Sequence, residues 1–269
     1  MNNCAEHNDT VRRIWSNPDL VLLVFAGSAA EFALNRAVDW LFFTGNIPSD
    51  PIGRFFSTVA FAQQIVFADD QSARRACAQI NSIHGSVEKD RGLTIPEWAY
   101  RDVLYMLVYY SERAHELVFR PLSHPEREQL YESFYRLGEG LNIPRLPRSY
   151  SEWKVDRKRH LERDLAYSEY TALLYRQYRR HLGSWRYFIL LQLQALLAPE
   201  EVRRLLGLTP HTALARLIRV YSVIDSLSMA SLVRRVLVPL SYWPEIEKLD
   251  RYAIALTNAR NFRPKTVSL

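Results

Sequence analysis

Helix-start signals recur along this sequence and constrain its fold more than any other feature. Asp50-Pro51 opens the run "DPIGRFFSTVAFAQQIVFA", and Thr209-Pro210 opens another run further on. The S-x-x-E spacing of a capping box occurs at Ser123-Glu126 and again at Ser149-Glu152. Apolar residues follow these signals at three- and four-residue spacing, whereas strand signals are weak and only nine glycines occur in 269 residues. The sequence therefore predicts an all-α fold.

No internal repeat, low-complexity tract or Gly/Ser-rich linker divides the chain. A chain of 269 residues, of which 48% are hydrophobic, can bury a large core. The segment "GLNIPRLPRS" contains two prolines and is expected to be a non-helical connection. We therefore expect residues 1–269 to form a single large multi-helix domain.

The formal net charge is +6, and the excess comes from arginine because only five residues are lysine. A basic chain can bind nucleic acid or an anionic membrane surface, but arginine is also the usual partner of buried carboxylates and propionates. Residues 145–186 interleave arginines with tyrosines. Because those tyrosines fall at helical spacing, the stretch favours a solvated, partly paired helix face over a nucleic-acid site.

The longest charge-free runs, "LVLLVFAGSAA" and "YFILLQLQALLAP", are shorter than the ~20 residues that a membrane-spanning helix needs. The first residues show no apolar run followed by a cleavage site, so no signal peptide is predicted. Cys4 and Cys77 are too few for a disulfide framework or a thiolate metal site. We expect a cytoplasmic protein, with peripheral membrane contact left open.

His84 lies on the apolar stripe of the helix that is expected to begin near Asp69, so it is predicted to face the core. No H-E-x-x-H or C-x-x-C motif accompanies it, which argues against a multi-ligand zinc or di-iron site. A single buried histidine can bond a carbonyl oxygen, or it can ligate haem iron, because the porphyrin supplies the other four nitrogens. Five other histidines lie near helix ends or in arginine-rich turns and are expected at the surface or as caps: His115, His124, His160, His181 and His211.

Arg54 and Thr58 lie one turn apart on the same helical stripe as Phe61, so they point the same way. Burying an arginine is costly unless it meets an anion. A haem propionate would meet this need, and so would the carboxylate of Asp39 or Glu31 in the preceding apolar segment. A carboxylate in an apolar cavity is also a candidate general base with a raised pKa, although it more often pairs with an arginine.

Three segments taken in order resemble the MpaB-like oxygenase family, whose members include rubber oxygenases: "DPIGRFFSTVAF", "INSIHGSV" and "VFRPLSHPEREQLYESFYRLGEGLNIPRLPRSYSEW". The resemblance covers about residues 27–165. Its most specific parts are the P-x-x-R-x-x-x-T pattern at Pro51, Arg54 and Thr58 and the H-x-x-V pattern at His84 and Val87.

The resemblance implies an all-α, haem-dependent oxygenase that splits a carbon–carbon double bond of a long apolar substrate with dioxygen. In the rubber-cleaving branch, the histidine that matches His84 is the axial ligand of a b-type haem, and the residues that match Arg54 and Thr58 line the same pocket. The haem is expected in a buried pocket between helices. The apolar residues expected near its faces are Phe55, Phe61, Ile80 and Ile83.

The chain also departs from the family pattern. Rubber oxygenases carry a distal lysine immediately before the threonine, where this chain has Ser57, and a glutamate base upstream, for which Asp39 and Glu31 are the nearest acids. We expect Arg54, Thr58 and Asp39 to serve catalysis on an isoprenoid-like unsaturated substrate. The alternative is a helical protein that binds haem or lipid without catalysis. Nucleic acid is not an expected partner, and the oligomeric state is not defined.

Overall fold

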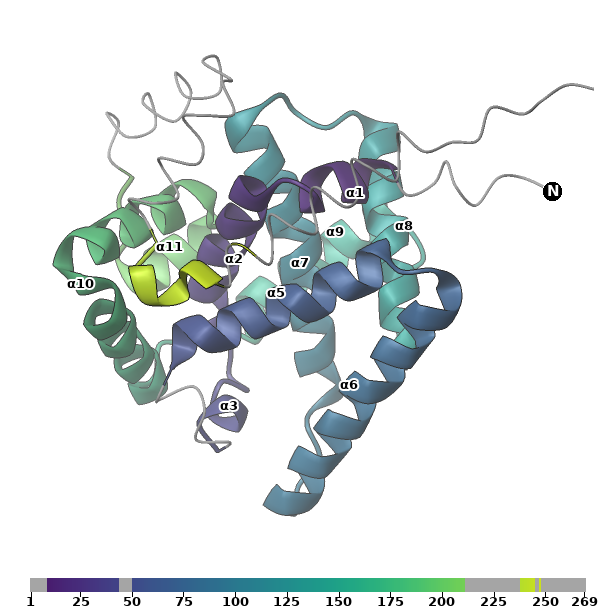
Figure 1. Cartoon of the computed structure of the whole chain (residues 1–269), viewed down its shortest axis with the longest axis horizontal. Coiled ribbons are helices and arrows are strands. Elements are labelled where there is room, and N and C mark those ends of the chain that lie inside the picture. The colour runs from purple at the N-terminus through teal and green to yellow at the C-terminus, as the bar shows by residue number, and fades with distance from the viewer. Residues whose placement is uncertain (1–8, 44–49, 211–237, 245–246, 248–269) are drawn as a thin grey trace, which may run out of the picture.

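A computed structural model describes residues 9–43, 50–210, 238–244 and 247 (Figure 1). These residues form helices and connections, and within them there is no strand beyond one isolated bridge between Asn35 and Leu165. The helices are α1 (Asp9–Trp15), α2 (Pro18–Phe32), α3 (Asp39–Phe43), α5 (Pro51–Phe67), α6 (Asp70–Arg91), α7 (Glu97–Val118), α8 (His124–Gly140), α9 (Tyr150–Arg163), α10 (Glu169–Leu197), α11 (Glu200–Leu206) and the short 3₁₀ helix η1 (Leu240–Tyr242). The predicted all-α fold is confirmed.

The predicted helix starts are observed wherever they fall on described residues. The Asp50 side chain caps α5, and Ser123 begins α8 with both halves of its capping box present. Ser149 begins α9, but the Glu152 carboxylate accepts from the Arg148 N–H at 2.8 Å, so the reciprocal half of that box is displaced by one residue. The helix predicted after Thr209-Pro210 lies outside the described residues, as do both ends of the expected 1–269 domain.

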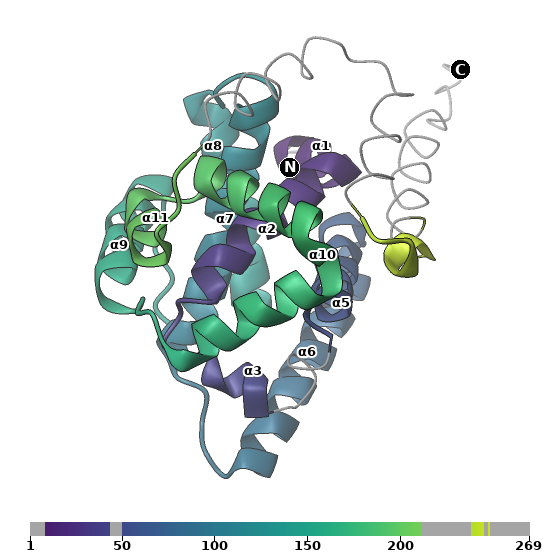
Figure 2. The same cartoon turned by 90° about the vertical axis from the view of Figure 1, so that its left-hand side faces the viewer.

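The core forms where α2 packs against α7, with α10 crossing both helices (Figure 2). Gly27 permits this close approach, because a Cβ atom at that position would lie 2.3 Å from the Tyr110 ring. Trp15 at the end of α1 is fully buried in the same core and donates its indole N–H to Ser111 on α7 at 3.0 Å. Helices α2 and α7, which carry most of the core, therefore pack close together.

Helices α5 and α6 are joined at Phe67 and diverge from there, with α7 behind them (Figure 1). The first half of α6 packs through Ala76 and Cys77, which are buried. The second half leaves the core, so Ile83 is 43% exposed although the sequence places it on the apolar stripe. None of the described helices has the length and apolar character required to cross a bilayer.

Substitution of Gly27 by alanine tests the close approach of α2 and α7. The added methyl group overlaps the Tyr110 ring, so we expect a loss of about 1–3 kcal/mol in the free energy of unfolding. Gly85→Ala is the matched control, because nothing lies within 4 Å of its would-be Cβ and the helix should gain up to about 1 kcal/mol. Urea unfolding of both variants measures the difference, and equal effects would contradict the packing described.

Glu126 at the start of α8 predicts a specific pH dependence. Hydrogen bonds from Arg120, and then from Ser123 and Arg13, lower the pKa of Glu126 despite a smaller opposing effect of burial. A carboxyl group whose pKa is lower in the folded state stabilises the fold above its unfolded pKa of about 4.3, and this stabilisation is lost as the pH falls. Glu126→Gln should therefore be less stable than wild type at pH 7, and the gap in unfolding free energy should shrink below about pH 4. A gap that is the same at both pH values would refute this account.

Candidate functional site

The sequence predicts that His84 faces the core. The structure places His84 on α6, where its side chain is only half-buried. Its ring packs against the ring of Tyr100 on α7, with 5.1 Å between centroids. Burial lowers the pKa of His84, and the negative charge of Glu88 one turn later opposes this effect. Its ring nitrogens make no hydrogen bond to any described residue. A neutral imidazole with an unused nitrogen lone pair is the form of histidine that binds iron.

Arg54 and Thr58 are exposed on α5, so the expectation that Arg54 is buried is wrong. The sequence of α5 is apolar on most of its faces, and the face that packs inward carries Phe56, Val59 and Ala62 instead. The Thr58 hydroxyl donates to the backbone oxygen of Arg54 at 3.0 Å. Arg54 forms no ion pair with a described residue, so its guanidinium is available to an external anion.

The structure describes the other residues that were predicted to lie near a haem face, except for the side chain of one of them. Phe61 and Ile80 are half-buried on α5 and α6, respectively, and the side chain of Phe55 lies outside what the structure describes. The predicted site residues thus lie on the two diverging helices. Among the described residues, no hydrogen bond joins Arg54 or Thr58 to His84.

Asp39, half-buried at the start of α3, pairs with Arg91 at the end of α6. One carboxylate oxygen accepts from Arg91 at 2.5 Å, and the Arg91 guanidinium lies 4.1 Å from the centroid of the Trp40 ring. Asp39 therefore does not pair with Arg54, although it was one of the partners expected for that arginine. The pair instead connects α3 to the far end of α6.

Glu31 on α2 is fully buried in an ion-pair network and pairs with an arginine, which was the alternative to a general base, but the sequence did not identify its partners. Both oxygens bind the Arg157 guanidinium, one of them at 2.5 Å, and Tyr110 donates to the carboxylate at 3.1 Å. Burial raises the pKa of Glu31, but the charge and hydrogen bonds of Arg157 and of His160 outweigh it and lower that pKa to about 2. Glu31 is therefore ionised and held by its partners, which removes the basis for a general base with a raised pKa.

His160 is buried and its ring contacts three carboxylates, so the expectation that it lies at the surface or caps a helix is wrong. Its Nε2 lies 3.0 Å from Glu31, and its Nδ1 lies 2.7 Å from Asp102 on α7 and 3.5 Å from Asp164. Burial lowers the pKa of His160, but the close approach of these three carboxylates outweighs it and raises that pKa to about 10. The sequence did contain a signal: Arg157, His160 and Asp164 recur at three- and four-residue spacing on one face of an otherwise charged helix.

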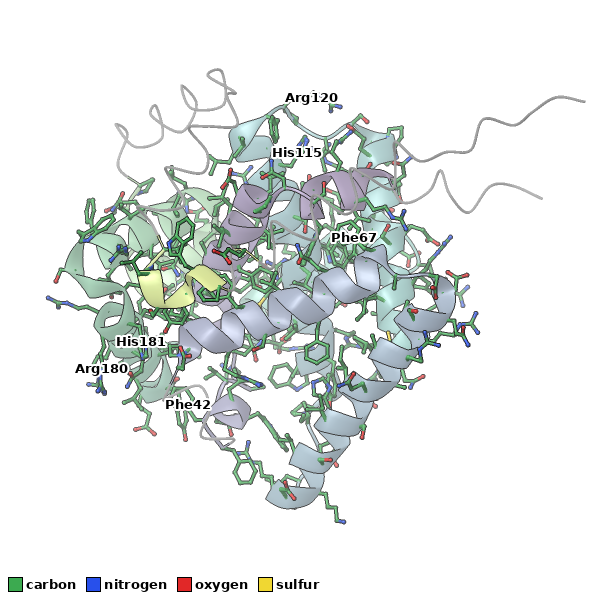
Figure 3. All side chains as sticks on the ribbon, in the orientation of Figure 1. Phe42, Phe67, His115, Arg120, Arg180 and His181 are labelled. Atoms are coloured by element: carbon green, nitrogen blue, oxygen red, sulfur yellow. The ribbon has the colours of Figure 1, made fainter. Side chains whose placement is uncertain are left out.

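The remaining histidines differ in exposure. His115 is also buried, contrary to a surface position, and its Nδ1 lies 3.1 Å from the Arg120 carbonyl oxygen just beyond α7 (Figure 3). It therefore keeps the expected role near a helix end. His124 is exposed as predicted, His181 is half-buried with Nδ1 3.1 Å from the Tyr242 hydroxyl, and His211 lies outside the described residues.

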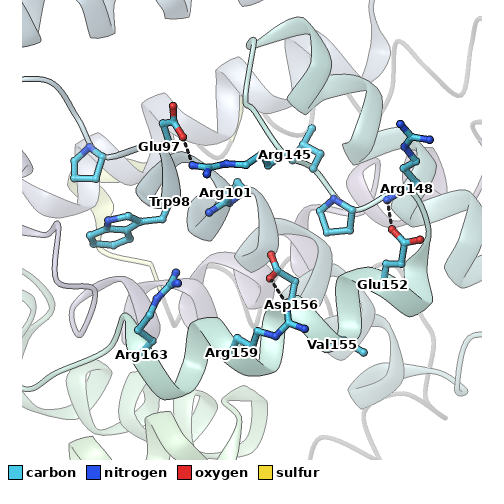
Figure 4. Close-up of a pocket in the computed structure, with 13 residues that line it drawn as sticks. Glu97, Trp98, Arg101, Arg145, Arg148, Glu152, Val155, Asp156, Arg159 and Arg163 are labelled. Atoms are coloured by element: carbon cyan, nitrogen blue, oxygen red, sulfur yellow. Dashed lines mark hydrogen bonds and ion pairs between the residues drawn. The ribbon is translucent and has the colours of Figure 1, made fainter.

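A basic cleft of about 1030 Å³ lies between the start of α7, the connection before α9, and α9 itself (Figure 4). Arg145 pairs with Glu97 at the start of α7, and Arg159 pairs with Asp156 along α9. Its lining includes none of the residues predicted to hold haem: it consists of Pro96, Glu97, Trp98, Arg101, Arg145, Leu146, Pro147, Arg148, Glu152, Val155, Asp156, Arg159 and Arg163. The cleft is therefore not the expected cofactor pocket.

A known protein family matches most of the chain. A family model described as "ER-bound oxygenase mpaB/B'/Rubber oxygenase, catalytic domain" matches residues 14–224. Because this match covers well over half of the sequence, the chain belongs to that family of oxygenase catalytic domains. No curated protein matches the chain. Membership indicates a small-molecule substrate and dioxygen, and the matched range contains His84 and Arg54 as well as the Glu31 network.

Substitution of Glu31 tests the network. Glu31→Gln leaves the Arg157 guanidinium buried without its counter-charge, so we expect a loss of about 3–5 kcal/mol in unfolding free energy. Glu162→Gln on α9 is the control, because its pair with Lys158 is exposed and worth less than about 1 kcal/mol. Chemical denaturation measures both variants. Losses of similar size would show that Glu31 does not hold the core.

Proposed function

We propose that this protein is a haem-dependent oxygenase that cleaves a carbon–carbon double bond of an apolar, isoprenoid-like substrate, with His84 as the axial ligand of a b-type haem. The observation that carries the proposal is the half-buried imidazole of His84, which has no hydrogen bond to a described residue and lies inside the matched oxygenase domain. Its lowered pKa supports the role, because only the neutral ring can donate a lone pair to iron.

The apolar surroundings of His84 fit a haem face. Ile83 and Val103 are 43% and 40% exposed, and Val103 lies one turn beyond Tyr100, the residue whose ring contacts His84. Ile80 lies one turn before His84 and is half-buried. A porphyrin placed against these side chains would remove apolar surface from water, which stabilises the complex by about 25 cal/mol per Å².

Polar residues on α5 supply the second part of the fit. The Arg54 guanidinium has no ion-pair partner among the described residues, and guanidinium groups bind carboxylates such as a haem propionate through paired hydrogen bonds. The Thr58 hydroxyl donates to its own helix and keeps its acceptor lone pairs. When bound, the haem would supply the redox chemistry that reaction with dioxygen requires.

Proton transfer is assigned to Asp39 in this proposal. Glu31 is enclosed by Arg157, Tyr110 and His160, whereas one oxygen of Asp39 has no hydrogen bond to a described residue. Asp39 is also half-exposed, so a bound substrate can reach it.

Haem binding to the wild type and to His84→Ala tests the assignment. On titration with haem, the wild type should develop a Soret band that saturates at one haem per chain, and the variant should lose or shift that band because the axial nitrogen is removed. His124→Ala is the matched control, since its ring is exposed, and it should bind as the wild type does. An unchanged band in His84→Ala, or none in the wild type, would refute the proposal.

A second candidate function is a binding protein that holds haem or a lipid without catalysis. Two observations favour it: Ser57 stands where rubber oxygenases have a lysine and donates to the Gly53 carbonyl oxygen, and both candidate bases are engaged by arginines. Oxygen consumption by the haem-loaded chain with an unsaturated isoprenoid distinguishes the two. Uptake that falls in Asp39→Asn supports the oxygenase, whereas ligand binding without uptake supports the binding protein.

A further inference from the structure

A second cluster of potential ligands lies in the core where α9 meets α7, formed by Asp102, His160 and Asp164. One ligating atom from each residue lies within 4.8 Å of the others, and all three side chains are buried. His160 and Asp164 are four residues apart, at the end of α9 and its C-cap, and Asp102 faces them from α7. The fold thus brings a ring nitrogen and two carboxylates together in the buried interior.

The two nitrogens of His160 have different environments. Nε2 lies 3.0 Å from Glu31, a carboxylate that Arg157 keeps ionised. Nδ1 lies 2.7 Å from Asp102 and 3.5 Å from Asp164, yet it makes no hydrogen bond of acceptable geometry with either. Metal-binding histidines commonly donate one ring N–H to a carboxylate, which leaves the lone pair of the other nitrogen for the metal.

The two carboxylates are also oriented by separate partners. Asn35 donates to the outer oxygen of Asp102 at 2.9 Å, while Oδ1 of Asp102 faces His160. Arg163 holds Asp164 through two hydrogen bonds, at 2.6 and 2.8 Å. Each of the three potential ligands therefore has a hydrogen-bonding partner outside the cluster that orients its side chain. Metal ligands in proteins are commonly oriented by such outer partners.

From this geometry we propose that Asp102, His160 and Asp164 bind one divalent transition-metal ion, separate from the haem at His84. One imidazole nitrogen and two carboxylate oxygens suit Zn²⁺, Mn²⁺ or Fe²⁺, whereas Ca²⁺ and Mg²⁺ take oxygen ligands alone and Cu⁺ takes sulfur. The ion joins α9 to α7 beneath the basic cleft, because Arg163 both lines the cleft and holds Asp164. Its role is to stabilise the junction of the two helices.

The competing structure is a metal-free ion cluster. In it a protonated His160, Arg157 and Arg163 balance the three carboxylates of Glu31, Asp102 and Asp164. A bound ion would replace the proton on Nδ1, so the two structures differ by one metal ion and one proton. Direct measurement of metal binding separates them.

The experiment uses the full chain, haem-free and treated with a chelator that is then removed. Titration with Co²⁺ should produce visible d–d absorption that saturates at one ion per chain, and Zn²⁺ should abolish it by competition and raise the melting temperature. Asp164→Asn removes the charge of one ligand, so it should weaken Co²⁺ binding by at least the roughly 10-fold that loss of an outer partner costs. Glu162→Gln, an exposed acid on the same helix, should bind as wild type does. His84→Ala should also bind Co²⁺ normally, so failure of the haem assignment leaves this test intact.

If Asp164→Asn does not fold, measurements on the wild type alone test whether the metal site exists. A wild-type chain that shows no Co²⁺ absorption and no change of melting temperature with Zn²⁺ would overturn the metal site and establish the metal-free cluster. Binding that persists at full strength in a folded Asp164→Asn, or that disappears in His84→Ala, would place the ion elsewhere and overturn the proposal equally.

Discussion

The buried ion pair between Glu31 and Arg157 is the interaction on which the rest of the structure depends. It joins α2 to α9, and His160 extends it to Asp102 on α7. Removing ions from water costs several kcal/mol for each ion, so such a network is stable only when its members are fully paired. Backbone hydrogen bonds beside it, from Arg36 to Asp164 and from Ala166 to Leu34, hold the same junction. The position of α7 follows from this network.

The position of α7 affects the surroundings of His84, because the two faces of this helix contact different parts of the molecule. The inward face carries Asp102 and Tyr110 into the network, and the outward face carries Tyr100 against the ring of His84. The network also determines what Glu31 cannot do, since a carboxylate surrounded by a guanidinium, an imidazole and a phenol has no lone pair left for a substrate proton. The network thus positions the helix whose Tyr100 packs against His84.

The diverging helices α5 and α6 contrast with this centre. They carry Arg54, which has no ion pair with a described residue, His84, which has no hydrogen bond to a described residue, and the exposed apolar side chain of Ile83. Such a combination is unusual in a core but is suited to a large, flat, apolar group that carries carboxylates. The proposed haem would therefore complete the packing that the chain leaves unfinished between these helices.

The sequence predicted the helices well because their capping residues act locally, within three residues of each helix start. It failed where long-range partners decide. Arg54 was expected to be buried because it shares a helical stripe with Phe61. Packing against the core instead selects Phe56 and Val59 as the inward residues of α5. His160 was expected at the surface or as a cap because it lies in an arginine-rich stretch. Its acidic partners come from segments more than 50 residues earlier in the chain, apart from Asp164.

A crystal structure of the haem-loaded chain, at a resolution that defines the iron coordination, tests the central claim most directly. The iron should be bonded to a ring nitrogen of His84, a propionate should lie within hydrogen-bonding distance of Arg54, and Glu31 should still be bound to Arg157. Iron bound to any other residue, or haem lodged in the basic cleft beside Trp98 with His84 still packed on Tyr100, would contradict it.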